Sequence, residues 1–492
     1  MSKKQIVFIM TDTTRADMLG CYGNKGMKTP NLDKLAEEGM KFNKAYTCQP
    51  VCGPARSALF TGTYPHSNGM FTNSLSMGEN VKTIGQRLTD NGIHAAYIGK
   101  YHLDGGDYFG LGICPDGWDP AYWYDMRCYL EELGREERIK SRNPATNRVG
   151  IDESFTFANR CTKRAVDFIE THRDEDFMLV VSYDEPHDPC LCPEPYASMY
   201  EGYSFPRYPN VYDTLEGKPE YQKVWAGDNR KADRDTVPIG NPYFFGCNSY
   251  VDYEIGKVID AAHKAVPDAM VVFTSDHGDA MQSHCITNKG PAIYDEVARI
   301  PLIISGFGKG IQYDGPVSHI NLAPMVLEYM GLPVPKLMEG KSLLPVLKDP
   351  SVKANEYVFI EFGRYEVDHD GFGGLQLMRG VTDGRFKLAV HLLDSDELYD
   401  TAEDPYEMQN LIHSAEHAGN RDRLHDALLK WMNDTRDPFR GYYWERRPWR
   451  TDARPATWDY TGYTRQRENE EYEPRQLDYA TGLEMVEAVR RK

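Results

Sequence analysis

A short segment that begins at Cys52, CGPARSALFTG, holds the residue types most suited to covalent chemistry. The pattern predicts a helix that begins near Cys52, and a helix N-terminus offers free backbone N–H groups and a partial positive charge. These features favour an anionic ester as the bound group. A cysteine phosphatase needs five residues between its cysteine and its arginine, whereas three separate Cys52 from Arg56. Phosphatase chemistry of that kind is therefore excluded.

Two other segments offer ligands for a metal ion. Asp12 follows the apolar run QIVFIM, and Asp276 with His277 follows the run AMVVFTS. Two carboxylates and an imidazole suit a hard divalent cation. Taken singly, an aspartate at the end of a strand is more often a turn or helix-capping residue. A metal site is expected because these segments are predicted to meet at one edge of a sheet.

Four basic side chains occur in further polar segments. GKYHLDG contains Lys100 and His102, which project to the same side if the segment is extended. EPHDP contains His187, and TNKGPAIYDE contains Lys289. Each one alone could be an ordinary surface lysine or a structural histidine. The four residues therefore indicate a functional site only when they are considered together and in this order along the chain.

Together, these segments resemble the type I sulfatases of the alkaline phosphatase superfamily, and most of all the bacterial members made without an export signal. The resemblance rests on Cys52, Pro54 and Arg56 followed by Leu-x-Thr-Gly, and it extends over residues 5–411. It implies that a maturation enzyme oxidises Cys52 to formylglycine, an aldehyde that hydrates to a geminal diol. Gly53 and Ala55 depart from the small hydroxylated residues that the family often has there. An unmodified buried thiol is the alternative.

The same resemblance implies a metal site. Asp12, Asp276 and His277, together with an oxygen of the modified Cys52, would hold one divalent cation. Calcium is the ion expected first, with magnesium or manganese as alternatives. Thr13 stands where the family commonly has a second aspartate, so the site lacks one formal negative charge, which weakens the case for calcium.

The resemblance also implies roles in the hydrolysis of a sulfate monoester to an alcohol and inorganic sulfate. Arg56 and the metal would hold one hydroxyl of the diol as the nucleophile that attacks sulfur. Lys100 and Lys289 would neutralise charge on the sulfuryl oxygens. His187, with Lys289, would protonate the leaving oxygen, and His102 would accept the proton whose removal expels sulfate. The resemblance implies a small-molecule or carbohydrate sulfate ester as the substrate. The sequence does not identify which ester it is.

Two other functions stay open. Relatives in the wider superfamily use the same modified residue on phosphonate monoesters and phosphodiesters. A catalytically silent, metal-binding homologue with an unmodified Cys52 is the second alternative.

The elements that must position these residues follow an α/β pattern. Apolar runs rich in β-branched residues alternate with helical patterns, which predicts a large, mostly parallel sheet flanked by helices. These runs cover residues 5–10, 94–99, 177–182, 269–275 and 300–305. Polar clusters follow four of them, and ligands of open α/β sheets bind beyond the carboxyl ends of the strands. We therefore predict the active site at that edge.

The chain is expected to divide into three parts. Residues 1–350 form the catalytic domain, with an irregular excursion over residues 190–245 beside the site. Residues 351–436 form a smaller antiparallel sheet with a helix. Residues 437–492 are an aromatic, arginine-rich tail, which is either solvated, wrapped around a neighbouring subunit of a homo-oligomer, or bound to an anion.

Charge and hydropathy narrow the class of protein further. The formal net charge of -18 disfavours nucleic-acid binding, and any anion site must be built from specific cations. The N-terminal apolar run is too short for a secretory signal, and no run approaches the length of a membrane span. We expect a cytoplasmic protein with no membrane partner, whose cysteines are mostly free thiols.

Overall fold

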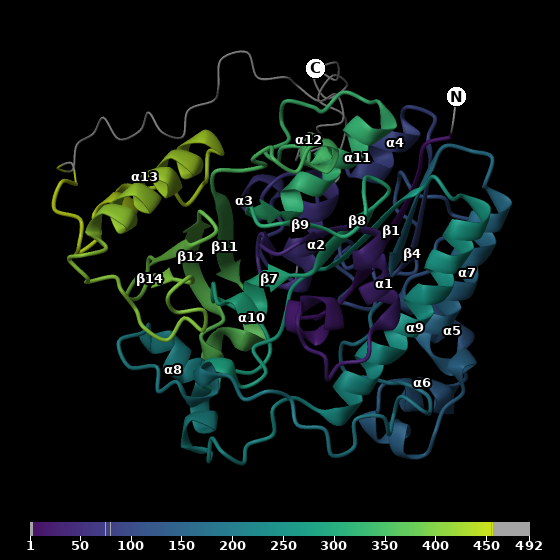
Figure 1. The fold of residues 1–492 in the computed structure, drawn as a ribbon, viewed down its shortest axis with the longest axis horizontal. Coiled ribbons are helices and arrows are strands. Elements are labelled where there is room, and N and C mark those ends of the chain that lie inside the picture. The colour runs from purple at the N-terminus through teal and green to yellow at the C-terminus, as the bar shows by residue number, and fades with distance from the viewer. Residues whose placement is uncertain (1–2, 74, 79, 454, 456–492) are drawn as a thin grey trace, which may run out of the picture.

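The computed structural model describes residues 3–73, 75–78, 80–453 and 455. Within these residues, seven strands form a central sheet in the order β4–β5–β1–β6–β8–β2–β9 (Figure 1). β4, β5, β1 and β6 run parallel, and β8 runs antiparallel to both β6 and β2. The predicted, mostly parallel α/β sheet is confirmed. Its strands are β1 (Gln5–Thr11), β2 (Gly39–Phe42), β4 (His94–Gly99), β5 (Phe177–Ser182), β6 (Met270–Ser275), β8 (Leu302–Ser305) and β9 (Ile311–Tyr313).

Helices cover both faces of this sheet, which is why its central strands are uninterrupted apolar runs. Alternate residues of β1 point to opposite faces: Val7 and Ile9 pack against one helical layer, and Ile6 and Phe8 against the other. The first layer contains α1 (Pro30–Glu38), α5 (Met126–Glu132), α7 (Phe157–Thr171) and α9 (Pro242–Ala265). The second contains α2 (Cys52–Thr61), α4 (Ile84–Thr89), α11 (Leu322–Met330) and α12 (Leu344–Lys348).

The excursion over residues 190–245 is more ordered than predicted. Its end belongs to α9, which begins at Pro242 behind an Asn241 side chain that accepts a hydrogen bond from the Tyr243 N–H. Proline in the first turn after an asparagine cap is a helix-start signal.

Further α-helices of the main part are short. They are α3 (Pro65–Asn68), α6 (Arg135–Ser141), α8 (Glu220–Ala226), which lies within the excursion, and α10 (Asp295–Ala298).

A second, antiparallel sheet lies beside the main part (Figure 1). Its apolar face packs on the main part, where Tyr46 and Val51 share one core with Ile360 and Phe362. The predicted smaller sheet with a helix is confirmed, whereas the exact domain boundaries stay a prediction. Its elements are β11 (Val358–Arg364), β12 (Leu375–Thr382), β13 (Phe386–His391), β14 (Glu397–Asp400) and α13 (Ala418–Asp434); a minor sheet joins β3 (Ala45–Tyr46), β7 (Arg299–Ile300) and β10 (Val317–Ser318).

The first part of the tail folds back on this second sheet and includes α14 (Tyr442–Glu445). Asp437 accepts two hydrogen bonds from Arg379, at 2.6 and 3.0 Å, and both side chains are buried. Arg447 pairs with Asp396, so one arginine of the predicted arginine-rich tail already has a carboxylate of the chain itself as its partner. The rest of the predicted tail, residues 456–492, lies outside the described residues.

The ten cysteines all lie in the described ranges and are free thiols there, as predicted. None of the helices described for this chain is long and apolar enough to cross a membrane.

Candidate active site

The carboxyl ends of the parallel strands bring the predicted residues together. Thr11 of β1 pairs in register with Ser275 of β6, and Met10 pairs with Ser182 of β5, so these strands end at one level. Gly99 of β4 also pairs with Ser182. The chemistry-bearing residues that follow these ends are Asp12, Lys100, Asp184, Asp276 and His277.

Asp12, Cys52, Asp276 and His277 form a fully buried cluster. One ligand atom of each lies within 4.8 Å of all the others, which is twice a Ca–O bond of about 2.4 Å. Sγ of Cys52 is 3.8 Å from Oδ1 of Asp12. Nδ1–H of His277 donates to the Gly278 carbonyl at 2.8 Å, so its unprotonated Nε2 is left to face the cluster. This donor set fits a hard divalent cation.

Thr13 supports both carboxylates of the cluster. Its hydroxyl donates to Oδ1 of Asp12 at 2.6 Å, and its backbone N–H donates to Oδ1 of Asp276 at 3.1 Å. Its φ of 66° is unusual for a β-branched residue and marks local strain of the kind found at functional sites. The sequence indicated only a lost charge at this position, whereas the structure shows that Thr13 orients two ligands.

Two buried cations balance these carboxylates. Nη2 of Arg56 lies 3.1 Å from Asp12 and Nε lies 3.0 Å from Asp276. Nζ of Lys100 lies 2.8 Å from Asp12 and 2.9 Å from Asp184, as ion pairs whose angles fall short of hydrogen bonds. Burial opposes both charges, but the carboxylates prevail and raise the pKa of Arg56 and of Lys100. Asp184 was not predicted, although it directly precedes the segment EPHDP.

The two carboxylates differ in their ionisation. Burial opposes ionisation of Asp12, but Lys100, His187 and Arg56 together hold its pKa well below the usual range. Burial and the charge of Asp12 raise the pKa of Asp276 to about 7. A divalent cation between them would stabilise both ionised forms.

Cys52 is the first residue of α2 and is 2% exposed. The next N–H, of Gly53, donates to the side chain of Asn73 at 2.9 Å, a partner that sequence spacing did not reveal. Burial, followed by the charge of Asp12, raises the pKa of the Cys52 thiol. The unmodified side chain is therefore a protonated thiol at neutral pH, and a protonated thiol is a weak nucleophile.

His102 follows β4 with a φ of 57° and is buried. Neither of its ring nitrogens has a hydrogen-bond partner in the part of the chain that the structure describes. Burial and the charges of Lys100 and Arg56 lower its pKa well below the usual value. His102 is thus a neutral imidazole with the capacity to accept a proton.

His187 and Lys289 form a pair at the entrance. Nζ of Lys289 lies 3.3 Å from Nε2 of His187, whose Nδ1–H donates to the Asp188 carbonyl at 3.0 Å. Burial, Lys100 and Lys289 lower the pKa of His187 to about 4. The pKa of Lys289 is raised well above its usual value, against the effect of burial, by negative groups that include Asp12. The proton of this pair therefore resides on Lys289.

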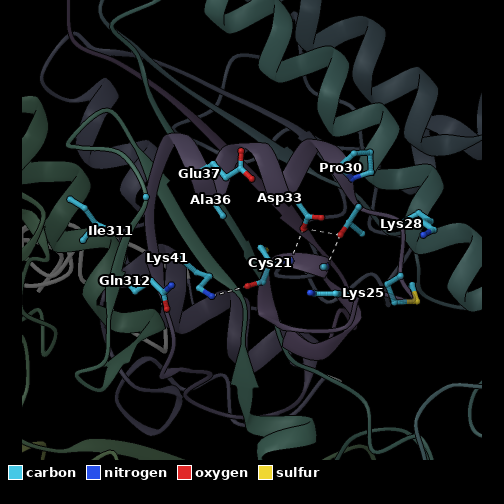
Figure 2. Close-up of a pocket in the computed structure, with 14 residues that line it drawn as sticks. Cys21, Lys25, Lys28, Pro30, Asp33, Ala36, Glu37, Lys41, Ile311 and Gln312 are labelled. Carbon is cyan, nitrogen blue, oxygen red and sulfur yellow. Dashed lines mark hydrogen bonds between the residues drawn. The ribbon is translucent and has the colours of Figure 1, made fainter.

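Two pockets differ in their position relative to this buried centre, and only one of them has predicted site residues in its wall. A pocket of ≈ 270 Å³ has Thr13, His187 and Lys289 in its wall and so lies beside the centre. A larger hollow of ≈ 680 Å³ lies against α1, β2 and β9, where Lys41 donates to the Cys21 carbonyl (Figure 2). None of the predicted site residues lines this larger hollow, so the smaller pocket is the candidate substrate site.

A buried carboxylate and imidazole cluster at the carboxyl edge of such a sheet, with a cysteine at a helix N-terminus, is the arrangement of a metal-dependent ester hydrolase. The chain belongs to the sulfatase family: the family model "Sulfatase" matches residues 4–332, and the model "N-sulphoglucosamine sulphohydrolase, C-terminal" matches residues 287–434. The chain is accordingly a sulfatase enzyme, as the sequence indicated.

Known relatives agree with this assignment. The chain is 44% identical to the uncharacterized sulfatase YidJ of Escherichia coli K12 over 98% of this chain and 97% of that protein. BT4656, solved with its substrate D-glucosamine-2-N,6-O-disulfate, superimposes with a TM-score of 0.73 at 20% identity, covering 88% of this chain and 98% of that one. The phosphonate monoester hydrolase of Agrobacterium radiobacter gives 0.71 at 21% identity, covering 88% and 96%. These two likenesses establish the shared fold.

Proposed function

We propose that this sulfatase hydrolyses a sulfate monoester of a small molecule or carbohydrate through formylglycine made from Cys52, with one divalent cation. The observation that carries the proposal is the position of Cys52, which starts a helix within ligand distance of two aspartates and a histidine. A formylglycine-generating maturation enzyme is then a required partner. The expected cytoplasmic location and homo-oligomer stay predictions that fractionation and light scattering would test.

Asp12, Asp276 and His277, with an oxygen of the modified residue 52, are the proposed ligands, and calcium is the expected ion because oxygen donors predominate. When bound, the cation supplies Lewis acidity at residue 52 and at the sulfuryl oxygens. Thr13 holds the two carboxylates in position.

The hydrated aldehyde would supply two hydroxyls, one to attack sulfur and one whose deprotonation releases sulfate. Arg56 and Lys100 lie beside Asp12 and keep their charge, so they favour an anion at this position. Lys289 stands at the pocket side and would neutralise the outer oxygens of the sulfate.

The proton transfers are assigned to Lys289, His187 and His102. Lys289 carries a proton and contacts His187, so this pair would protonate the departing alcohol oxygen, with Lys289 as the source of the proton. His102, neutral and without a partner among the described residues, would accept the proton from the second hydroxyl. The alcohol and sulfate would leave, and water would hydrate the restored aldehyde to the diol again.

A second candidate function is the hydrolysis of a phosphonate monoester or a phosphodiester with the same nucleophile. The fold shared with the phosphonate monoester hydrolase supports keeping it. Phosphonate monoesters and phosphodiesters carry less charge than a phosphate monoester. Arg56, Lys100 and Lys289 would therefore accommodate them as they would a sulfate monoester.

Two measurements test the proposal. Mass spectrometry of the peptide that contains residue 52, from protein made in its own host, should show the mass of formylglycine. Sulfate release from aryl and sugar sulfates should exceed turnover of an aryl phosphonate monoester and an aryl phosphate diester. A phosphorus ester favoured by orders of magnitude would select the second function, and a pure thiol peptide with no turnover would select a silent homologue.

A further inference from the structure

Three side chains that can bind a metal ion meet at the edge of the central sheet opposite the catalytic centre. His94 is the first residue of β4, His172 follows the last residue of α7, and Glu175 lies in the turn before β5. One ligand atom of each lies within 4.8 Å of the others. The catalytic residues follow the carboxyl ends of the same parallel strands, so about the length of a strand, roughly 20 Å, separates the two clusters.

The distances in this cluster are close to those of a tetrahedral zinc site. Nδ1 of His94 lies 3.1 Å from Oε2 of Glu175, and Nδ1 of His172 lies 3.1 Å from Oε1 of the same carboxylate. Zinc binds histidine nitrogen and carboxylate oxygen at about 2.0–2.2 Å, which places neighbouring tetrahedral ligands about 3.4 Å apart. The three side chains would therefore share one ion with little movement.

His94 faces a carboxylate at each of its ring nitrogens. Nε2 lies 2.7 Å from Oδ2 of Asp119, and Nδ1 lies 3.1 Å from Glu175. A neutral imidazole carries one N–H, which the shorter contact takes, so Nδ1 presents a lone pair to the second carboxylate. The two acceptors repel each other unless a cation lies between them.

His172 favours a metal ion over a proton as that cation. Its Nδ1 faces the same carboxylate of Glu175, and a metal ion binds several donors at once whereas a proton is shared by two. The carboxylate of Asp119 behind His94 is the usual partner of a metal-binding histidine, because it fixes the tautomer that leaves the other ring nitrogen unprotonated.

The protein holds these groups in place without an ion. The ring centroid of the buried Phe168 lies 5.1 Å from that of His94 and 4.6 Å from that of His172. The buried Gln5 side chain donates to the backbone carbonyl of Glu175 at 3.0 Å and so fixes the turn. The Glu175 side chain is 51% exposed, so an ion would enter from the surface and keep water as its fourth ligand.

We propose that His94, His172 and Glu175 form a structural zinc site that joins the end of α7 to the start of β4. Two imidazoles and one carboxylate suit Zn²⁺, whereas Ca²⁺ takes oxygen ligands only. The site is separate from the proposed function and does not depend on it. With three protein ligands at the surface, it should bind Zn²⁺ with a Kd of about 1 μM and lose the ion on dialysis.

Calorimetric titration of the calcium-loaded enzyme with ZnCl₂ tests the proposal, with Ca²⁺ kept in excess to occupy the catalytic centre. The wild-type enzyme should bind one Zn²⁺ at this affinity. Asp119→Asn should weaken the binding about 10- to 100-fold, because Asp119 acts through His94, and His172→Gln or Glu175→Gln should weaken it more. Asp174→Asn removes a charge from an exposed position beside the cluster and should keep the wild-type affinity.

Thermal unfolding gives a second reading of the same site. Zinc at about a hundred times its Kd should raise the thermal midpoint of the wild-type enzyme by about 2–3 °C and leave that of His172→Gln unchanged. Circular dichroism would check that each variant folds. A wild-type enzyme that binds no zinc under these conditions, or wild-type affinity in both His172→Gln and Glu175→Gln, would overturn the proposal.

Discussion

Sγ of Cys52 lies 3.1 Å from Nε2 of His277, although 225 positions separate the two residues in the chain. The contact places the proposed nucleophile inside the proposed metal site. Chemistry at residue 52 and binding of the cation should therefore depend on each other, and the predictions below separate the two.

Replacement of Cys52 by alanine should lower kcat at least about a thousandfold, because no hydroxyl remains to attack sulfur. The fold should persist, since the change removes one small buried group. Cys52→Ser should release at most one equivalent of alcohol and then stop with the serine sulfated. Intact-protein mass spectrometry and steady-state assays would check both. Repeated turnover near the wild-type rate in either variant would refute the nucleophile assignment.

Removal of the cation should abolish turnover and lower the thermal midpoint, because Asp12 and Asp276 would then face each other without it. Elemental analysis should find about one divalent ion per chain. Asp276→Asn should weaken binding of the ion, whereas Asp174→Asn should not. Full activity after exhaustive chelation, with no ion detected, would contradict the metal site.

His102→Ala should slow the release of sulfate more than the first chemical step, because His102 is assigned to the second proton transfer. The expected record is a burst of alcohol near one equivalent, followed by a steady rate lower by about a hundredfold. Rapid-quench measurement of alcohol and sulfate in the same reaction distinguishes the steps. Equal slowing of both products would remove this role from His102.

The contact between His66 and Glu361 should make stability depend on pH. Burial opposes the charged imidazole, but Glu361 prevails and raises the pKa of His66 above its value in the unfolded chain. The contribution to stability is therefore complete below the unfolded pKa of about 6.5 and is lost as pH rises through the folded pKa. His66→Gln should cost more free energy of unfolding at pH 5.5 than at pH 9. The exposed His413→Gln serves as the control, and a cost independent of pH would contradict the assignment.

The sequence predicted the elements that carry strong local signals. β1, β4, β5 and β6 lie within one residue of the predicted runs because buried parallel strands are uninterrupted apolar stretches. The convergence of Asp12 with Asp276 followed from strand ends alone. The structure brings together all the predicted ligand residues, whereas their roles in catalysis still require the experiments above.

Other features depend on tertiary contacts that no local pattern encodes. Asp184 and Asn73 contact Lys100 and Gly53 only because distant segments meet. The antiparallel direction of β8 likewise follows from its partners in the sheet and not from its composition. α9 begins inside the segment that was predicted to be irregular. Asn241 followed by proline is a local signal for this start, but the irregular sequence before it gave no reason to expect a helix there.

The burial of Cys52 limits when its oxidation can occur. With 2% of its surface accessible and a helix built on it, the side chain is out of reach of another protein once the native state has formed. The proposed maturation enzyme would therefore have to act on a nascent or unfolded chain. A cell that synthesises this polypeptide faster than it can oxidise the thiol would accumulate well-folded molecules that no later encounter can activate.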